Sequence, residues 1–205
     1  MYSEIYYKPF NHLKKDKVMS FLIEKFGDKI DIKDRYYSNY AKAIAELIIE
    51  QQISFKVAIS IKKKFNHLIS GKSDNEILRI EDDKLKSIGI SRMKVKYIKN
   101  VYQYFLDNKI RFDDLDDINI IKELTTIKGV GSWTAEMFLI FILFRENIFS
   151  KKDIALINSI KINYDNENLS DMRLDKLIES WSPYNTYASL LLWKSIEEKI
   201  FFKEN

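Results

Sequence analysis

Hydrophobic residues recur every three or four positions along most of this 205-residue chain, which is the spacing of helices that bury one face. No stretch shows the alternation of hydrophobic and polar residues that is typical of a strand, and we find no internal repeat. The predicted fold class is therefore all-α. The expected helices span about residues 18–26, 36–51, 55–70, 74–80, 92–106, 118–124, 132–145, 154–163, 171–181 and 183–200.

The same pattern predicts how several of these helices begin and which residues they bury. Ser54 is placed to cap the helix that follows it, and Pro183 suits the first turn of the last helix. In the helix after Ser54 we expect Val57 to be buried and Lys62 to face outward. Lys94, on the outer face of another helix, is also expected to face outward.

Composition narrows the function classes. The chain has no cysteine, which excludes disulfides, thiolate zinc sites and iron–sulfur clusters. With 34 Lys and Arg against 30 Asp and Glu, the net charge is only +4, so any basic surface has to be local. His12 and His67 are too isolated for a metal site or a catalytic triad.

Nothing in the sequence predicts membrane targeting. The first ten residues lack the apolar core of a signal peptide, and the longest apolar run, residues 137–144, is too short to cross a bilayer. We expect a cytoplasmic protein that is monomeric and has no membrane partner.

A short segment between two predicted helices carries the clearest sign of a binding site. It reads Lys128-Gly129-Val130-Gly131, and it precedes the helix over 132–145, which is apolar nearly all round and expected to be buried. Two glycines allow a tight turn and leave the backbone N–H groups accessible, at a helix N-terminus that favours an anion. The segment predicts a phosphate clamp, although an ordinary turn between helices has the same local sequence.

The wider motif reads L-x-x-I-K-G-V-G-x-W-T-A over residues 124–135, and Asp153 follows Gly131 by 22 positions. This pattern resembles the helix-hairpin-helix DNA glycosylase superfamily, and within it the alkylpurine (3-methyladenine) DNA glycosylases. Further segments that resemble the family are 48–54, 89–98 and 181–193, so the resemblance covers nearly the whole chain.

The resemblance implies two helical lobes with a cleft between them. Residues 1–36 together with 146–205 would form one lobe. Residues 37–145 would form the other and would contain the hairpin at 124–135. Two positions depart from the family pattern, because Asn185 stands where many relatives have Arg and Lys128 stands where they usually have Pro.

The resemblance also implies which residues meet DNA. The expected phosphate-binding residues of the hairpin are Lys128, Gly129, Val130, Gly131 and Thr134. A structural Na⁺ or K⁺ is expected on the backbone carbonyls of Thr125, Ile127 and Val130, and no other cofactor is expected. Gln52 and Ile53 are expected to form a wedge that fills the gap left by a flipped-out nucleotide, although Ile53 also suits an ordinary apolar loop contact. Lys151 and Lys152 adjoin Asp153 and are expected to contact phosphates.

Asp153 has two interpretations. Residues 150–153 have capping-box spacing, so the carboxylate could serve only to cap a helix. In the family, the aspartate at this spacing faces the flipped-out nucleoside. A fixed negative charge there would stabilise the oxocarbenium-like state through which a glycosidic bond breaks, and it could orient or deprotonate the attacking water.

Trp133 bears on the type of reaction. It could simply belong to the core, but bifunctional relatives carry a Lys at this position, and that amine attacks the sugar. Tryptophan cannot do so, which predicts hydrolysis that stops at the abasic site. Its ring would also suit a positively charged alkylated base. The expected base pocket comprises Trp133, Met137, Tyr184 and Trp193; for Tyr184 and Trp193, core packing is an equal alternative.

The sequence therefore predicts a monofunctional DNA glycosylase that removes alkylated purines from duplex DNA. We expect it to act on the cell's nucleoid. Two alternatives stay open, which are a non-catalytic DNA-binding protein and a glycosylase for another lesion, such as an etheno adduct, a deaminated base or an oxidised purine. A pure DNA-binding protein would have no need of the carboxylate of Asp153.

Overall fold

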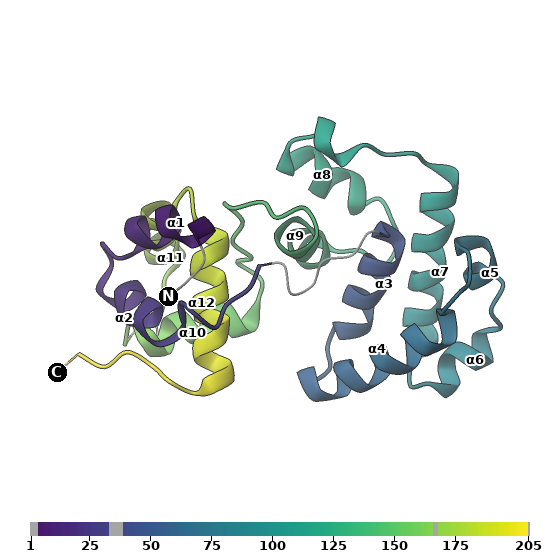
Figure 1. The fold of residues 1–205 in the computed structure, drawn as a ribbon, viewed down its shortest axis with the longest axis horizontal. Helices are drawn as coiled ribbons and strands as arrows, with labels where there is room; N and C mark the ends of the chain where they lie inside the picture. Colours follow the sequence, from purple (N-terminus) through teal and green to yellow (C-terminus); the bar gives the residue numbers. More distant parts are fainter. Residues whose placement is uncertain (1–3, 33–38, 166–167, 205) are drawn as a thin grey trace. The chain divides into compact units, whose positions relative to one another are not determined.

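The computed structural model describes residues 4–32, 39–165 and 168–204. Within these ranges the chain forms helices and no strand, which confirms the predicted all-α class. The helices belong to two compact units, and Figure 1 shows them. We call residues 1–34 with 143–205 the terminal unit, and residues 35–142 the central unit.

The terminal unit is built around its last helix. Its helices are η1 (Glu4–Tyr6), α1 (Tyr7–Leu13), α2 (Lys17–Phe26), α10 (Ile154–Asn163), α11 (Asp171–Trp181) and α12 (Asn185–Glu198). Helix α12 packs against α1, α2, α10 and α11, as Figure 1 shows. Its residues Ala188, Leu191 and Leu192 are fully buried. Each buried leucine contributes about 1.5–3 kcal/mol by removing apolar surface from water, so α12 supplies much of this unit's stability.

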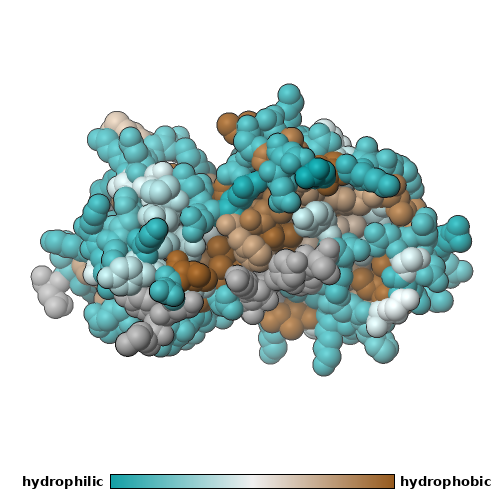
Figure 2. All heavy atoms as spheres, turned by 45° about the horizontal axis from the view of Figure 1, so that its top comes forward, coloured by the Kyte–Doolittle hydropathy of each residue, from teal (hydrophilic) through white to brown (hydrophobic). Residues whose placement is uncertain are grey.

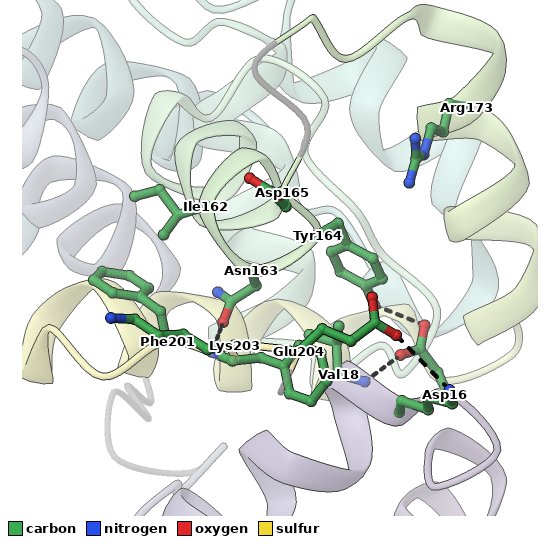
Figure 3. A pocket seen from close by; sticks show the side chains of 12 residues that line it. Asp16, Val18, Ile162, Asn163, Tyr164, Asp165, Arg173, Phe201, Lys203 and Glu204 are labelled. Atoms are coloured by element: carbon green, nitrogen blue, oxygen red, sulfur yellow. Dashed lines mark hydrogen bonds and ion pairs between the residues drawn. The ribbon is translucent and has the colours of Figure 1, made fainter.

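Asp16 joins three helices of the terminal unit. It is the N-cap of α2, and its Oδ1 accepts hydrogen bonds from the backbone N–H groups of Val18 (2.8 Å) and Met19 (3.1 Å). Its Oδ2 accepts from the hydroxyl of Tyr164 (2.7 Å), as Figure 3 shows, and from the indole N–H of Trp181 (3.3 Å). Burial and the nearby carboxylate raise the pKa of Tyr164, so its hydroxyl stays protonated and donates. Asp16 thus links the start of α2 to the ends of α10 and α11.

The central unit is organised around its first helix. Its helices are α3 (Tyr40–Glu50), α4 (Phe55–Ile69), α5 (Asp74–Leu78), α6 (Asp82–Ser87), α7 (Arg92–Asp107), η2 (Phe112–Asp114), α8 (Asp117–Leu124) and α9 (Ser132–Phe141). Helix α3 packs against α4, α7 and α9, and all its residues from Ala41 to Ile49 except Lys42 are buried. Helix α9 is buried from Met137 to Phe141, as its apolar sequence predicts.

The predicted orientation of α4 is wrong at two positions. Val57 is 47% exposed, whereas the side chain of Lys62 is only 16% exposed. The ammonium group of Lys62 pairs with the carboxylates of Glu50 and Glu46 on α3. These two acidic residues lie one turn apart on α3 and attract a lysine of α4. The face of α4 that meets α3 is therefore not the one that hydrophobicity alone predicts.

The prediction for Lys94 is also wrong. Its side chain is half-buried, and its Nζ donates hydrogen bonds to the backbone carbonyls of Ile49 (2.9 Å) and Gln51. Both carbonyls belong to the C-terminal end of α3, where a positive charge interacts favourably with the helix dipole. Ile49 is 45 residues away from Lys94 in sequence. The local pattern around Lys94 therefore does not predict this contact.

Several helix ends differ from the sequence expectation. Helix α9 ends at Phe141 rather than near residue 145. Pro183 precedes α12, whose N-cap is Tyr184, so it does not occupy the first turn. Ser54 is the N-cap residue of α4, but its side chain makes no capping hydrogen bond. Helix α3 begins at Tyr40, capped by Asn39; residues 36–38 of the predicted helix lie outside the described ranges.

None of the helices in the described ranges is long and apolar enough to span a membrane. Figure 2 shows one face of the molecule, on which hydrophilic residues predominate and hydrophobic residues gather in smaller groups. The exposed large hydrophobic residues include Val57, Ile59 and Met93.

Candidate functional site

The two hairpin glycines have different structural roles. Gly129 has a φ of +109°, and a Cβ atom built there would lie 2.2 Å from Cγ of Tyr97. Only glycine fits such a conformation and such a close approach. Gly131 has an extended conformation, and nothing lies within 4 Å of a Cβ built on it. Gly129 therefore makes the turn, and Gly131 leaves open space at the N-terminus of α9.

The hairpin presents backbone groups rather than side chains. Gly131 is the N-cap of α9 and has no side chain that could accept from the first-turn N–H groups. Before it, the N–H of Val130 donates to the carbonyl of Ile127 (2.9 Å), which closes the turn. An anion placed at Gly131 would meet N–H donors and the positive end of the α9 dipole. The local geometry therefore suits a phosphate group.

Three hydrogen bonds hold the hairpin on the central unit. Asn100 on α7 donates through Nδ2 to the carbonyl of Lys128 (3.0 Å). Gln51 donates through Nε2 to the carbonyl of Gly129 (3.3 Å) and to the hydroxyl of Thr134 (2.9 Å). Thr134 is almost fully buried, so its hydroxyl supports the hairpin from inside. Neither Gln51 nor Asn100 was predicted from the sequence to support the hairpin.

The three carbonyls predicted to hold Na⁺ or K⁺ lie where the chain leaves α8. The carbonyl of Ile127 accepts one hydrogen bond, from Val130, and an oxygen with two lone pairs can still bind a cation. The hydroxyl of Thr125 donates to the carbonyls of Ile121 (2.8 Å) and Lys122 (3.0 Å). Among the described residues, no group of three or more His, Cys, Asp and Glu side chains could hold a metal, so a cation here would depend on backbone carbonyls.

The predicted wedge lies in the turn between α3 and α4. Gln52 is exposed and has a φ of +56°, a left-handed conformation that is uncommon for any residue other than glycine. Ile53 is half-buried. A conformation of this kind persists only where its surroundings hold it, and such positions are frequent at functional sites.

Asp153 begins α10 in the terminal unit and is only 8% exposed. Its Oδ1 accepts hydrogen bonds from the backbone N–H of Leu156 (2.9 Å) and from the indole N–H of Trp193 on α12 (3.1 Å). Asp153 therefore does cap a helix, as one interpretation predicted. It is itself the N-cap of α10, whereas a capping box starting at residue 150 would have placed it at N3. The second bond was not predicted, because Trp193 was expected only in the base pocket or in the core.

Residues near Asp153 in sequence have varied surroundings. The ammonium group of Lys151 pairs with Asp175 on α11 (2.5 Å), so a phosphate contact would compete with a carboxylate. Lys152 is exposed. Trp133 is half-buried and Met137 buried; they lie four residues apart on α9 and so share one face of that helix. Trp133 and Met137 belong to the central unit, and Asp153 belongs to the terminal unit.

Two residues of the C-terminal segment pack inside the terminal unit. The ring of Tyr184 contacts the rings of His12 (centroids 5.5 Å apart) and Tyr187 (6.1 Å). Asn185 is buried, and its Nδ2 donates to Oδ1 of Asn147 (2.7 Å). A short buried amide here fills a position where a longer guanidinium side chain would need different neighbours.

A cavity of about 700 Å³ lies elsewhere in the terminal unit, and Figure 3 shows it from close by. Its lining includes Tyr164, Arg173 and Phe202. Residues 201–204 form part of its wall. They are held there by the backbone N–H of Phe202, which donates to Oδ1 of Asn163 (2.8 Å). None of the predicted site residues lines this cavity.

The sequence profile of the HhH-GPD superfamily base excision DNA repair proteins matches residues 45–183. The DNA-3-methyladenine glycosylase of Saccharomyces cerevisiae is 26% identical over 196 residues, which cover 76% of this chain and 66% of that enzyme. This chain therefore spans about two thirds of that relative's length.

Two solved structures have similar folds. The DNA-3-methyladenine glycosidase of Bacillus halodurans is 29% identical and has a TM-score of 0.73. The aligned region covers 93% of this chain and 90% of that one. The 3-methyladenine DNA glycosylase of Schizosaccharomyces pombe, solved in complex with abasic DNA, is 23% identical, with a TM-score of 0.84 and coverage of 93% and 97%.

Proposed function

Because this chain belongs to the HhH-GPD superfamily of base excision DNA repair proteins, we propose that it is a monofunctional DNA glycosylase. It hydrolyses the N-glycosidic bond of alkylated purines, of the 3-methyladenine and 7-methylguanine type, in duplex DNA. The product is an abasic site. The relatives named for this activity support the substrate class, and we propose that the protein works as a monomer.

The observation that carries this proposal is the fixed carboxylate of Asp153. It is nearly buried and is held by the N–H groups of Leu156 and Trp193. As the bond between the sugar and the purine lengthens, positive charge grows on the sugar, and a carboxylate in a dry site stabilises it. Water then adds to the sugar carbon and transfers a proton to the carboxylate of Asp153. An alkylated purine already carries positive charge, so it leaves as a neutral base without a strong acid.

Trp133 supports the monofunctional assignment. An indole cannot attack the sugar to form a Schiff base. The neutral amine of a lysine at this position could do so. Borohydride should therefore trap no covalent complex between the wild-type protein and damaged DNA. Efficient trapping would show that another amine attacks the sugar and that the protein is bifunctional.

The phosphate clamp gives the proposal a separate binding test. If hairpin N–H groups and nearby lysines neutralise phosphates, the logarithm of the affinity for abasic-site DNA should fall with the logarithm of salt by about 0.9 per phosphate. Gly131→Val should weaken binding and leave the thermal midpoint nearly unchanged, because there is open space for the side chain. Normal binding by this variant would contradict a clamp at Gly131.

The decisive experiment is incubation with methylated genomic DNA followed by chromatographic identification of every free base. We expect 3-methyladenine and 7-methylguanine to be released by the wild-type protein. Release of an oxidised, deaminated or etheno-modified base from suitably damaged DNA, with no release of methylated purines, would change the substrate class. Binding without any release would leave only a DNA-binding function.

A further inference from the structure

One face of α7 contacts both segments of the central unit that are expected to meet DNA. Lys94, Tyr97 and Asn100 follow one another at intervals of three, so they lie along one side of the helix. Lys94 donates to the carbonyls of Ile49 and Gln51, at the base of the turn that carries Gln52 and Ile53. Asn100 donates to the carbonyl of Lys128 in the hairpin. The ring of Tyr97 lies directly against Gly129.

Gln51 connects the same two segments a second time. Its backbone carbonyl accepts from Lys94, and its side-chain amide donates to the carbonyl of Gly129 and the hydroxyl of Thr134. Lys94, Gln51 and the hairpin therefore form one connected hydrogen-bond network within the central unit. The next residue, Gln52, has the left-handed φ of +56°. The network holds Ile49 and Gln51, which lie just before this left-handed residue.

The environment of Lys94 is that of an internal support and not of a surface phosphate contact. Within the described ranges, its ammonium group has two backbone carbonyls as partners and no carboxylate. Burial lowers the pKa of Lys94, which agrees with an ammonium group removed from solvent. A solvated helix face would leave the group exposed, as it leaves that of the neighbouring Lys96.

We infer that Lys94 is a positioning residue for base extrusion: it fixes the Gln52–Ile53 tip relative to the phosphate-binding hairpin. The inference rests on the proposed function. A rigid connection makes the tip enter the base stack when the hairpin takes its phosphate, so part of the binding energy opens the stack. Without the connection, phosphates still bind, but the tip moves independently and the base stays stacked more of the time.

The test compares Lys94→Met with Lys94→Arg and with the control Lys96→Met. Methionine keeps most of the apolar stem and removes the donors, whereas arginine keeps a charged donor. The control removes an exposed charge from the same helix. The DNA is a duplex with 7-methylguanine in a matched or a mismatched pair, and a second duplex carries 2-aminopurine beside an abasic site to report unstacking by fluorescence.

We expect Lys94→Met to bind abasic-site DNA within about threefold of wild type but to excise matched 7-methylguanine about tenfold more slowly. Excision from the mismatched pair should change much less, because an unpaired base is easier to extrude. The 2-aminopurine signal should fall in parallel. Lys94→Arg should restore much of both signals, and Lys96→Met should match wild type.

A role limited to capping α3 predicts a different result. Matched and mismatched excision would then fall equally, the fluorescence would be unchanged, and the inference would be wrong. If Lys94→Met lowers the thermal midpoint strongly, Gln51→Leu tests the same connection, because it removes the bonds to Gly129 and Thr134 and leaves Lys94 on its carbonyls. It should lower matched excision and the 2-aminopurine signal as Lys94→Met does, and normal values of both would overturn the inference. A wild-type protein that releases no base would refute the proposed function, whereas the fluorescence comparison would still decide the role of Lys94.

Discussion

Asp16 and Asp153 begin two helices of the terminal unit in nearly the same way. Each is an N-cap whose Oδ1 accepts a backbone N–H, at 2.8 Å from Val18 for Asp16 and at 2.9 Å from Leu156 for Asp153. Each carboxylate also accepts the indole N–H of a tryptophan. By local geometry alone, the two residues would be given the same role.

The surroundings of the two carboxylates differ. The donors to Asp16 are divided between its two oxygens: backbone N–H groups donate to Oδ1, and the hydroxyl of Tyr164 and the indole N–H of Trp181 donate to Oδ2. Trp181 is fully buried. In Asp153 the backbone N–H and the indole of Trp193 converge on Oδ1, and Trp193 is half-buried. Asp16 ties three helices together, whereas Asp153 is oriented by two donors. Capping α10 through Oδ1 therefore does not by itself exclude the proposed catalytic role of Asp153.

The largest expected effect is the loss of chemistry in Asp153→Asn. Asparagine keeps the size and can still accept a capping hydrogen bond, but it lacks the negative charge that stabilises the transition state. We expect single-turnover release of 7-methylguanine to fall about 100- to 1000-fold, with little change in the thermal midpoint or in binding to abasic-site DNA. Excision within about threefold of wild type would remove Asp153 from the active site.

Asp16→Asn is the matched control. The amide nitrogen cannot accept, so one of the donors on Oδ2 or the capping N–H groups loses its partner. We expect a loss of about 1–3 kcal/mol in the free energy of unfolding, or about 2–4 °C in the thermal midpoint per kcal/mol. Excision per folded molecule should be unchanged. A large loss of excision in a folded Asp16→Asn protein would break the distinction between the two caps.

A smaller effect is expected from the two tryptophans. Trp193→Phe keeps an aromatic ring and removes the N–H that orients the carboxylate of Asp153. Since a hydrogen bond to a charged group is worth about 1.5–3 kcal/mol, we expect excision to fall about tenfold or somewhat more. The measurement is single-turnover excision at saturating protein, which separates chemistry from binding.

Trp181→Phe is the counterpart on Asp16. It removes the indole donor and leaves unfilled space at a fully buried position, so we expect it to lower the free energy of unfolding by about 1–3 kcal/mol. The chemistry of the folded molecules should be normal. If both variants lost only stability, the bond from Trp193 would be structural, like the one from Trp181.

The sequence predicted those features that depend on neighbours in the chain. The ranges 154–163 and 171–181 agree with α10 and α11 because a capping residue, Asp153 or Ser170, stands directly before each helix and accepts a first-turn N–H. The all-α class followed from hydrophobic spacing, and the family followed from short motifs, chiefly the one over residues 124–153. These signals are local, and a single sequence contains them.

The sequence did not predict contacts between distant residues. The turn of Lys62 toward Glu46 and Glu50 reverses the orientation expected from hydrophobicity. Asp16 and Tyr164 are 148 positions apart, and no periodicity brings them together. The candidate site has the same limit. Asp153 and Trp193 were both named, but their hydrogen bond depends on the packing of α12 against α10.

The smallest expected effect belongs to Tyr164→Phe, which removes one donor from Asp16 and leaves Trp181 in place. We expect a loss of about 1 kcal/mol in the free energy of unfolding near neutral pH, with unchanged excision.

The pKa of Tyr164 is raised in the folded protein, chiefly by burial, whereas in the unfolded chain the hydroxyl ionises near its ordinary value of about 10. Its stabilisation is therefore present below that pH, and it declines above it by about 1.4 kcal/mol per pH unit. Phenylalanine has no such dependence, so denaturant unfolding at about pH 8 and about pH 11 should show the advantage of wild type shrinking or vanishing at the higher pH. A constant difference at both values would mean that the hydroxyl of Tyr164 does not stay protonated on Asp16.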